Sequence, residues 1–359
     1  MKKNIFKSML LAAFAMGIAA CSSDPVGPEP TPEYFSYGAF VVNSGNQTNK
    51  INGTLDYIEF GSNTIINNVF EKVNGRSLGI TANDAFVYGS KLYIAVDSEQ
   101  LVEVVDAKTL QSLKQIQLDG AARHLTACEG KMFVSSYSGD VCRIDTTSLT
   151  VDKTIKVGDY PEGMATYGNL VFVTNSGYGS GHTFTVIDGT TGNVTGTHEC
   201  PTNPTDIVCD GNYLYLLTSG TYKADWSGYE EDPAIYRINP DYLDFPLVTK
   251  GTAVASNFMK LYSFNANYYN PDITYRETDT NSGMYKELDL SKDIKYPCAI
   301  AADPITGHLW VSSYNLSEYG YADYSAPGYI VEYDSNMNKL HEYNTGVGPI
   351  AIAFFNNLK

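Results

Sequence analysis

The chain has 359 residues, of which 43% are hydrophobic and 18% are charged, and its formal net charge is -16. This composition is typical of a globular protein with a sizeable apolar core, and its 31 glycines and 28 tyrosines favour an all-β protein with many turns. The negative charge repels a phosphate backbone, so nucleic acid is not an expected partner.

The first twenty residues have the pattern of a targeting segment. A basic start, MKKNIFK, is followed by the apolar run SMLLAAFAMGIAA, which is too short to span a bilayer comfortably. The run ends in Ile18-Ala19-Ala20-Cys21, which resembles the lipobox of bacterial lipoproteins. That resemblance implies a signal peptide over 1–20, lipidation of Cys21 and a place at the outer membrane. Ordinary secretion with a chance cysteine is the alternative.

Residues 21–33 are expected to form a flexible tether. The stretch SSDPVGPEPTPE is rich in proline and acidic residues and cannot bury a core. Its early Asp24 resembles the export signal that sends Bacteroidetes lipoproteins to the cell surface. We therefore expect contact with the membrane through the lipid anchor only.

The cysteines do not indicate a disulfide framework or a zinc site. With Cys21 lipidated an odd number remains, and none of them shows CxxC spacing. One bridge, for example between Cys200 and Cys209, is an alternative that we do not favour. Cys128, Cys209 and Cys298 fall in apolar runs, where a small buried side chain fits well.

A repeated unit follows the tether, with successive copies beginning about 40 residues apart. In each copy a short apolar strand is followed by a turn and a second, strongly apolar strand, as in RHLTACE followed by KMFVSS. Two further strands, such as DVCRID and LTVDKTIKV, alternate between apolar and polar residues. Nearly continuous apolar strands are typical of strands covered on both faces. The second strands open at Ala39, Leu92, Met132, Leu170, Leu214, Leu261 and Leu309.

The two ends of the repeat array complement each other. Predicted strands at 38–43, 54–60 and 64–71 lack an innermost partner, and the final run GPIAIAFF, residues 348–355, is an innermost strand without outer ones. Joining them closes the array without exposed edges. We therefore predict one domain over 34–359, an all-β seven-bladed β-propeller in which N- and C-terminal strands share a blade. An open β-solenoid would leave the split unit unexplained.

One rim of the predicted propeller is rich in tyrosine. Loops that lead into the innermost strands and loops that join second to third strands lie on one face, and the run YNLSEYGYADYSAPGY is far longer than a turn requires. Aromatic rings there would form a broad amphipathic platform. The residues expected to bind a ligand are Arg123, Tyr137, Tyr160, Asn175, Tyr178, Trp226, Tyr268, Tyr296 and Tyr314. The alternatives are that tyrosines pack the loops onto neighbouring blades and that Arg123 pairs with Glu162.

Signals for an enzyme are poor. The sequence holds no HExxH, no GxSxG and no P-loop motif, so we expect no catalytic residue, no cofactor and no metal. A metal-dependent hydrolase is the minority interpretation. Propeller lactonases hold a channel metal with Glu, Asp and Asn, for which Glu162, Asn175 and Asp206 would be the set.

At the level of repeat motif the chain resembles the YncE-like seven-bladed propellers. The matching pieces are Pro161-Glu162-Gly163-Met164, the run LVFVTNSG at 170–177 and Val186-Ile187-Asp188. These motifs build blades and specify no chemistry.

With the lipobox and the aromatic rim, the chain also resembles the Bacteroidetes surface lipoproteins of BtuG type, which bind cobalamin. That resemblance implies capture of cobalamin (vitamin B12) for a TonB-dependent outer-membrane transporter, with Arg123 or polar neighbours meeting its amides or phosphate. A glycan-binding accessory lipoprotein of a polysaccharide uptake system and a scaffold that docks another protein are the alternatives.

Overall fold

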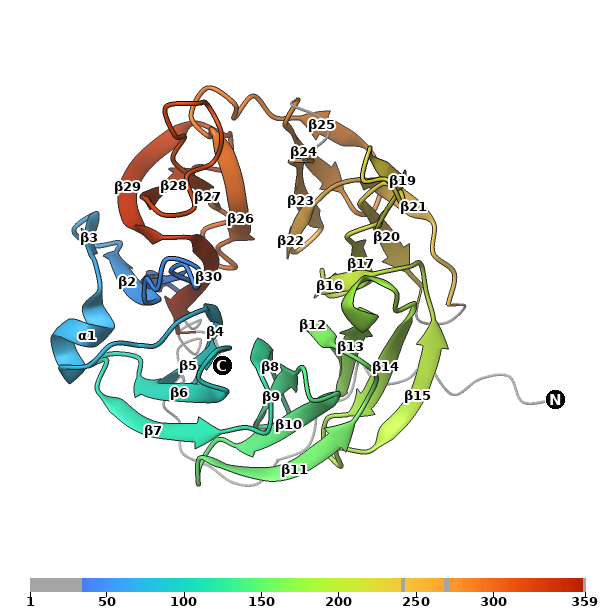
Figure 1. Cartoon of the computed structure of the whole chain (residues 1–359), viewed down its shortest axis with the longest axis horizontal. Helices are drawn as coiled ribbons and strands as arrows, with labels where there is room; N and C mark the ends of the chain where they lie inside the picture. Colours follow the sequence, from blue (N-terminus) through green and yellow to red (C-terminus); the bar gives the residue numbers. More distant parts are fainter. Residues whose placement is uncertain (1–33, 240–242, 268–271, 358–359) are drawn as a thin grey trace, which may run out of the picture. The chain divides into compact units, whose positions relative to one another are not determined.

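The computed structural model describes residues 34–239, 243–267 and 272–357, which form seven four-stranded antiparallel sheets. The sheets are arranged as the blades of a β-propeller around a central axis (Figure 1), and the region along this axis is called the channel below. The predicted fold class is therefore confirmed. The signal peptide, the lipidation of Cys21 and the tether lie outside the described residues, as does Tyr268. No helix in the described ranges is long and apolar enough to cross a membrane.

Each blade runs from an innermost strand at the channel to an outermost strand at the periphery. Blade 1 contains β30 (Pro349–Asn356), β1 (Ser36–Asn43), β2 (Thr54–Glu59) and β3 (Thr64–Ile66). Blade 2 contains β4 (Ala82–Tyr88), β5 (Lys91–Val96), β6 (Leu101–Asp106) and β7 (Ser112–Gln117). Blade 3 contains β8 (Ala122–Cys128), β9 (Lys131–Ser136), β10 (Asp140–Asp145) and β11 (Thr150–Lys156). Blade 4 contains β12 (Pro161–Tyr167), β13 (Leu170–Asn175), β14 (Thr183–Asp188) and β15 (Val194–Glu199).

The remaining blades follow the same order. Blade 5 contains β16 (Pro204–Cys209), β17 (Leu214–Thr218), β20 (Ala234–Ile238) and β21 (Leu247–Lys250). Blade 6 contains β22 (Ala253–Asn257), β23 (Lys260–Asn265), β24 (Thr274–Asp279) and β25 (Tyr285–Glu287). Blade 7 contains β26 (Tyr296–Ala302), β27 (Leu309–Tyr314), β28 (Pro327–Tyr333) and β29 (Lys339–Val347).

Blade 1 joins the two ends of the propeller domain, as the sequence predicted. β30 pairs with β1 in antiparallel register, with Val41 opposite Ile352. The Phe35 amide donates to the Asn357 side chain at 2.8 Å and extends the pairing beyond the strands. The C-terminal strand thereby fills the innermost position that the N-terminal strands leave open.

The predicted third strand of this unit, at 64–71, is partly wrong. β3 ends at Ile66, and the helix α1 (Val69–Asn74) follows. Asn68 adopts a left-handed conformation with φ 48° and donates its backbone N–H to the Asp56 carboxylate at 2.8 Å. This turn redirects the chain so that Phe70 is buried between blades 1 and 2.

The core of the described domain is distributed between the blades. Buried apolar clusters lie at each of the seven interfaces between neighbouring blades. At the interface of blades 7 and 1, the fully buried Trp310 stacks on Phe60 with ring centroids 5.3 Å apart. Since each blade buries its faces only against its two neighbours, the ring has to close for every interface to form.

The innermost strands approach one another closely at the channel. A Cβ atom on Gly163 of β12 would lie 2.6 Å from the Cα atom of Asp206 in β16. That atom belongs to the backbone of the next blade and cannot move aside as a flexible side chain would. Glycine is therefore required at position 163 by the spacing of blades 4 and 5.

Replacing Gly163 by alanine should destabilise the protein by about 1–3 kcal/mol, because the added methyl group forces two innermost strands apart. Gly61→Ala is the matched control, since a Cβ there meets nothing within 4 Å. Urea unfolding of both variants measures the difference. Equal stabilities would contradict the close approach.

Candidate functional site

A β-bulge recurs where the innermost strands begin. In β8 the register with β9 shifts between Ala122 and Leu125, so that Arg123 and His124 lie in the bulge. β4, β12, β16 and β26 have register shifts at the corresponding place. Bulges change the direction of the side chains they contain and are common beside functional sites. They lie beside a polar cluster, which also draws on residues that follow the second strands of blades 2 and 3. We define this cluster as Asn83, Asp84, Asp97, Arg123, His124, Tyr137, Glu162 and Asp206.

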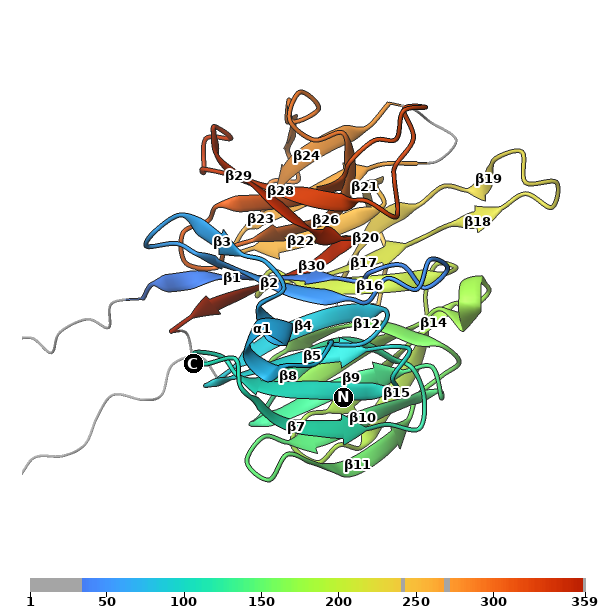
Figure 2. The same ribbon diagram turned by 60° about the vertical axis from the view of Figure 1, so that its left-hand side comes forward.

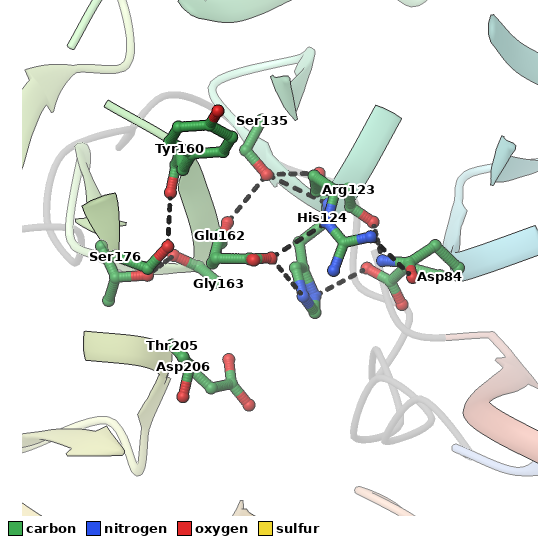
Figure 3. A network of polar contacts seen from close by, with 12 residues as sticks. Asp84, Arg123, His124, Ser135, Tyr160, Glu162, Gly163, Ser176, Thr205 and Asp206 are labelled. Carbon is green, nitrogen blue, oxygen red and sulfur yellow. Dashed lines mark hydrogen bonds and ion pairs between the residues drawn. The ribbon is translucent and has the colours of Figure 1, made fainter. Parts of the chain in front are cut away.

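Arg123 lies at the centre of the polar cluster (Figure 3). Its Nε donates to Glu162 Oε2 at 3.0 Å. Its Nη1 donates to Asp97 Oδ2 at 2.8 Å and to Asn83 Oδ1 at 3.3 Å. The guanidinium also lies 4.5 Å from the ring centroid of Tyr137. The Tyr137 hydroxyl donates in turn to the Glu162 carboxylate. Arg123 thus connects blades 2, 3 and 4, and the pairing with Glu162 that the sequence left open is present.

His124 lies between two carboxylates from different blades (Figure 3). Its Nδ1 is 3.7 Å from Asp84 Oδ2, and its Nε2 is 3.7 Å from Glu162 Oε2. Asp84 Oδ2 also accepts the backbone N–H of Leu125 at 2.8 Å. The Ser135 hydroxyl accepts the backbone N–H of His124 at 3.0 Å and donates to the Glu162 carbonyl at 2.7 Å. Side chains thereby form hydrogen bonds with the backbone groups that the bulge leaves without a partner in the neighbouring strand.

Burial shifts the pKa of three groups of the cluster, Asp84, His124 and Asp206. Burial raises the pKa of Asp84 to about 7 and the pKa of Asp206 to about 7, and the charge of Glu162 adds to the rise at Asp206. Burial and the charge of Arg123 lower the pKa of His124 to about 3. The side chains of His124 and Asp84 keep 31% and 20% of their surface exposed, so water reaches them. Shifted pKa values of this kind are common at functional sites.

A ladder of three tyrosines leads from the cluster to solvent. Tyr137, Tyr160 and Tyr178 have successive ring centroids 5.1 Å apart. Tyr160 is 39% exposed and Tyr178 is 78% exposed. The Ser176 hydroxyl accepts the Tyr178 amide at 3.3 Å and donates to the Tyr160 carbonyl at 2.9 Å, which fixes the loop containing the short helix η1 (Gly177–Gly179).

Blade 7 contributes a second aromatic group. The Tyr314 ring lies 6.3 Å from Tyr296 and 4.8 Å from Tyr324, measured between centroids. Burial raises the pKa of the Tyr314 hydroxyl above its usual value. The Asn46 amide donates to the Tyr324 carbonyl at 2.8 Å, so the loop after β1 supports the long loop after β27.

Blade 5 contributes a third aromatic group on an inserted hairpin. β18 (Thr221–Tyr222) and β19 (Tyr229–Glu231) form a separate two-stranded sheet between β17 and β20 that projects from the blade (Figure 2). The Tyr222 ring stacks on Tyr229 at 4.7 Å and lies 5.2 Å from Trp226. Trp226 is 68% exposed. Because every loop from a second to a third strand lies on one face, the three groups share that face, which we call the mouth face.

The predicted ligand-binding residues fall into these groups with one exception among those described. Arg123 belongs to the polar cluster. The aromatic groups contain Tyr137, Tyr160, Tyr178, Trp226, Tyr296 and Tyr314. Asn175 instead is 2% exposed, and its amide donates to Thr183 and Thr185 at 3.1 Å. Tyr268 lies outside the described residues.

Sequence reasoning missed Asp84 and Asp97 as members of the cluster. A signal for Asp84 was present in the repeat. The position two residues after the first residue of an innermost strand holds, in successive repeats, Asp84, His124, Gly163 and Asp206. Asp97 follows a second strand, where nothing in the sequence marks it as a partner of Arg123.

The described residues hold no group of three or more His, Cys, Asp or Glu side chains arranged to bind a metal ion. Glu162 and Asp206 are members of the polar cluster, whereas Asn175 is buried against Gly158, and its side-chain N–H groups donate to the threonines of β14. The described cysteines are unpaired, so no Cys200–Cys209 bridge forms. Burial raises their pKa, as for Cys128 to about 11, which keeps the thiols protonated and unreactive.

The sequence matches the family described as "Domain of unknown function (DUF5074)" over residues 37–348, so the chain belongs to that family. Among solved structures it is similar to Kuenenia stuttgartiensis hydrazine synthase, with 15% identity, a TM-score of 0.59, and coverage of 76% of this chain and 89% of that one. It is also similar to the Neurospora crassa Pan2 WD40 domain, with 10% identity, a TM-score of 0.54, and coverage of 75% and 78%. At these identities the likeness concerns the fold alone. No curated protein matches the sequence.

Asp206 should make the stability of the protein depend on pH. Its folded pKa of about 7 exceeds the value of roughly 3.9 for an unfolded aspartate, so the stability from its neutral form is complete below pH 4 and is lost as the pH rises through 7. Asp206→Asn keeps an oxygen for the Ile207 amide and should reduce this loss by on the order of 1–3 kcal/mol.

Urea unfolding between pH 4 and pH 8 measures the effect. Asp159→Asn is the control, because it makes the same substitution at an exposed position outside the polar cluster. An Asp206→Asn variant whose stability changes with pH as steeply as that of the wild type would contradict the shift.

Proposed function

We propose that this member of the DUF5074 family captures a large amphipathic ligand at its mouth face and leaves the ligand chemically unchanged. The observation that carries the proposal is the gathering of three aromatic groups, from blades 3 and 4, blade 5 and blade 7, on one face. Tyr178 and Trp226 expose 78% and 68% of their surface there. Flat rings supply apolar contact area while losing little side-chain entropy on binding.

The tyrosine ladder is preorganised for such a role. Tyr137 is held by the Glu162 carboxylate and the Arg123 guanidinium, and Tyr160 packs on it edge to face. A platform that is already ordered loses less entropy when a ligand settles on it. The polar cluster therefore contributes to ligand binding by holding the tyrosine rings in place, without contacting the ligand itself.

Cobalamin is the specific ligand that we propose, on the strength of the resemblance to the BtuG-type proteins. A broad macrocycle with apolar faces and a rim of amides suits a surface of phenol rings with hydroxyls at their edges. Burial of roughly 400 Å² of apolar ligand surface would contribute on the order of 10 kcal/mol before the costs of association. Since Arg123 already binds Glu162, Asp97 and Asn83, tyrosine hydroxyls and loop backbone are the proposed partners of the ligand's amides and phosphate.

The proposal includes a place for the protein in the cell. Lipidation of Cys21 would anchor the propeller at the outer membrane, with residues 21–33 as its tether. The ligand would then pass to a TonB-dependent transporter in the same membrane.

Glycan binding is a second candidate, and the hairpin favours it. Trp226 and Tyr222 lie 5.2 Å apart on an arm that projects from the blade. Aromatic faces pack well against the C–H groups of sugar rings, so this arm suits a saccharide better than it suits a macrocycle centred on the channel.

Titration calorimetry of the purified protein with cyanocobalamin tests the first proposal. Replacing Tyr160 and Tyr178 together by alanine should weaken binding at least tenfold, because two rings of the ladder are lost. Phe258→Ala is the control: this ring is 70% exposed but lies in the turn between the first and second strands of blade 6, on the opposite face.

If cyanocobalamin at micromolar concentration produced no heat of binding and did not co-elute with the protein, the cobalamin proposal would be wrong. If the double variant bound cyanocobalamin as tightly as the wild type, the binding site would lie elsewhere than at the tyrosine ladder.

A further inference from the structure

A cleft of about 320 Å³ lies beside the connection from blade 4 to blade 5, at the base of the inserted hairpin. Its lining includes Pro201, which precedes β16, Thr218, which ends β17, and Ala234, which begins β20. All three positions belong to the mouth face. The cleft shares no lining residue with the polar cluster or with the tyrosine ladder, so it is a separate site.

One side of the cleft is apolar. Leu247 is 59% exposed there, and the ring of Tyr236 and the pyrrolidine of Pro201 complete the surface. A leucine so exposed at the edge of a cleft leaves apolar area that a ligand can cover.

The other side of the cleft is acidic. Lys250 pairs with Asp232, so these two charges offset each other. Glu231 makes no ion pair with any residue in the described ranges, and its carboxylate leaves the cleft with one negative charge. Glu231 and Tyr236 both line the cleft. Burial, together with the Glu231 charge, raises the pKa of the Tyr236 phenol.

We propose that this cleft binds a neutral, hydroxyl-bearing ring such as a sugar residue, with the Glu231 carboxylate accepting hydrogen bonds from its hydroxyls and Tyr236 and Leu247 covering its C–H groups. The uncompensated carboxylate selects against anionic ligands. The inference takes its ligand class from the glycan candidate and adds the site and the charge selectivity. It does not depend on capture of cobalamin at the ladder.

The size and place of the cleft fit one end of a longer ligand. Its volume is at the lower end of the range for small-molecule sites, roughly 300–1,000 Å³. Glu231 pairs in register with Thr221 at the base of the hairpin, and Tyr222 and Trp226 follow along the same arm. An oligosaccharide with one ring in the cleft would place later rings over these aromatic side chains.

The test is calorimetry of the purified protein with maltohexaose, cellohexaose, xylohexaose and mannohexaose as neutral probes and pentagalacturonate as the anionic probe. We expect at least one neutral probe to bind and the anionic probe to bind at least tenfold more weakly. Glu231→Gln should weaken the neutral probe at least tenfold, since hydrogen bonds to a charged group are the stronger ones. Leu247→Ala, which removes part of the apolar side, should also weaken binding.

Glu230→Gln is the matched control, because it removes the same charge from the adjacent residue of β19, which does not line the cleft. Its affinity should equal that of the wild type, and thermal melts establish that each variant is folded. No binding of any neutral probe at millimolar concentration would overturn the inference, as would equal binding of the anionic probe. Binding that is lost in Trp226→Ala but unchanged in Glu231→Gln and Leu247→Ala would assign the glycan to the hairpin alone.

Discussion

The pairing of β30 with β1 is the constraint on which the rest of the structure depends. Each blade buries its two faces only against its neighbours, so an unclosed array would expose an apolar face at each end and an unpaired strand edge beside it. The antiparallel register of the two chain ends inside blade 1 removes both problems at once. The stack of Phe60 on Trp310 then completes the last interface of the ring.

Closure also forces the innermost strands together, and this crowding shapes the channel. Gly163 meets the backbone of the next blade so closely that no side chain fits. Bulges at the same place turn Arg123, His124 and their neighbours into the narrow space. Burying charge is costly unless it is paired, and the contacts of Arg123 with Glu162 and Asp97 offset that cost. Asp84 and Asp206 lose part of their hydration beside these residues, which is why their pKa values rise.

The mouth face combines the tyrosine ladder, which the blades hold in place, with a hairpin inserted into blade 5. The tyrosine ladder stands on the polar cluster, and its lower ring is fixed by contacts to two blades. The hairpin of blade 5 is an insertion outside the blade sheet, and it brings both an aromatic stack and the acidic side of a cleft. One scaffold thus presents two surfaces of different chemistry, a pattern that repeat proteins acquire by changing loops while they keep their strands.

The sequence by itself determined the architecture, because the features that build blades are local. Strand alternation, turn residues and the period near 40 residues can be read along the chain, and the incomplete units at its two ends predicted the shared blade. The grouping of tyrosines on one face followed from strand order alone. Only the tertiary structure decided what those side chains contact, since the decisive partners lie on different blades. Arg123 meets Glu162 and Asp97 across two interfaces, and Asn175, which has the residue type of a ligand, is instead buried against Gly158. A bulge changes the direction of a side chain without changing the sequence period, so repeat position could indicate Asp84 but could not orient it toward His124.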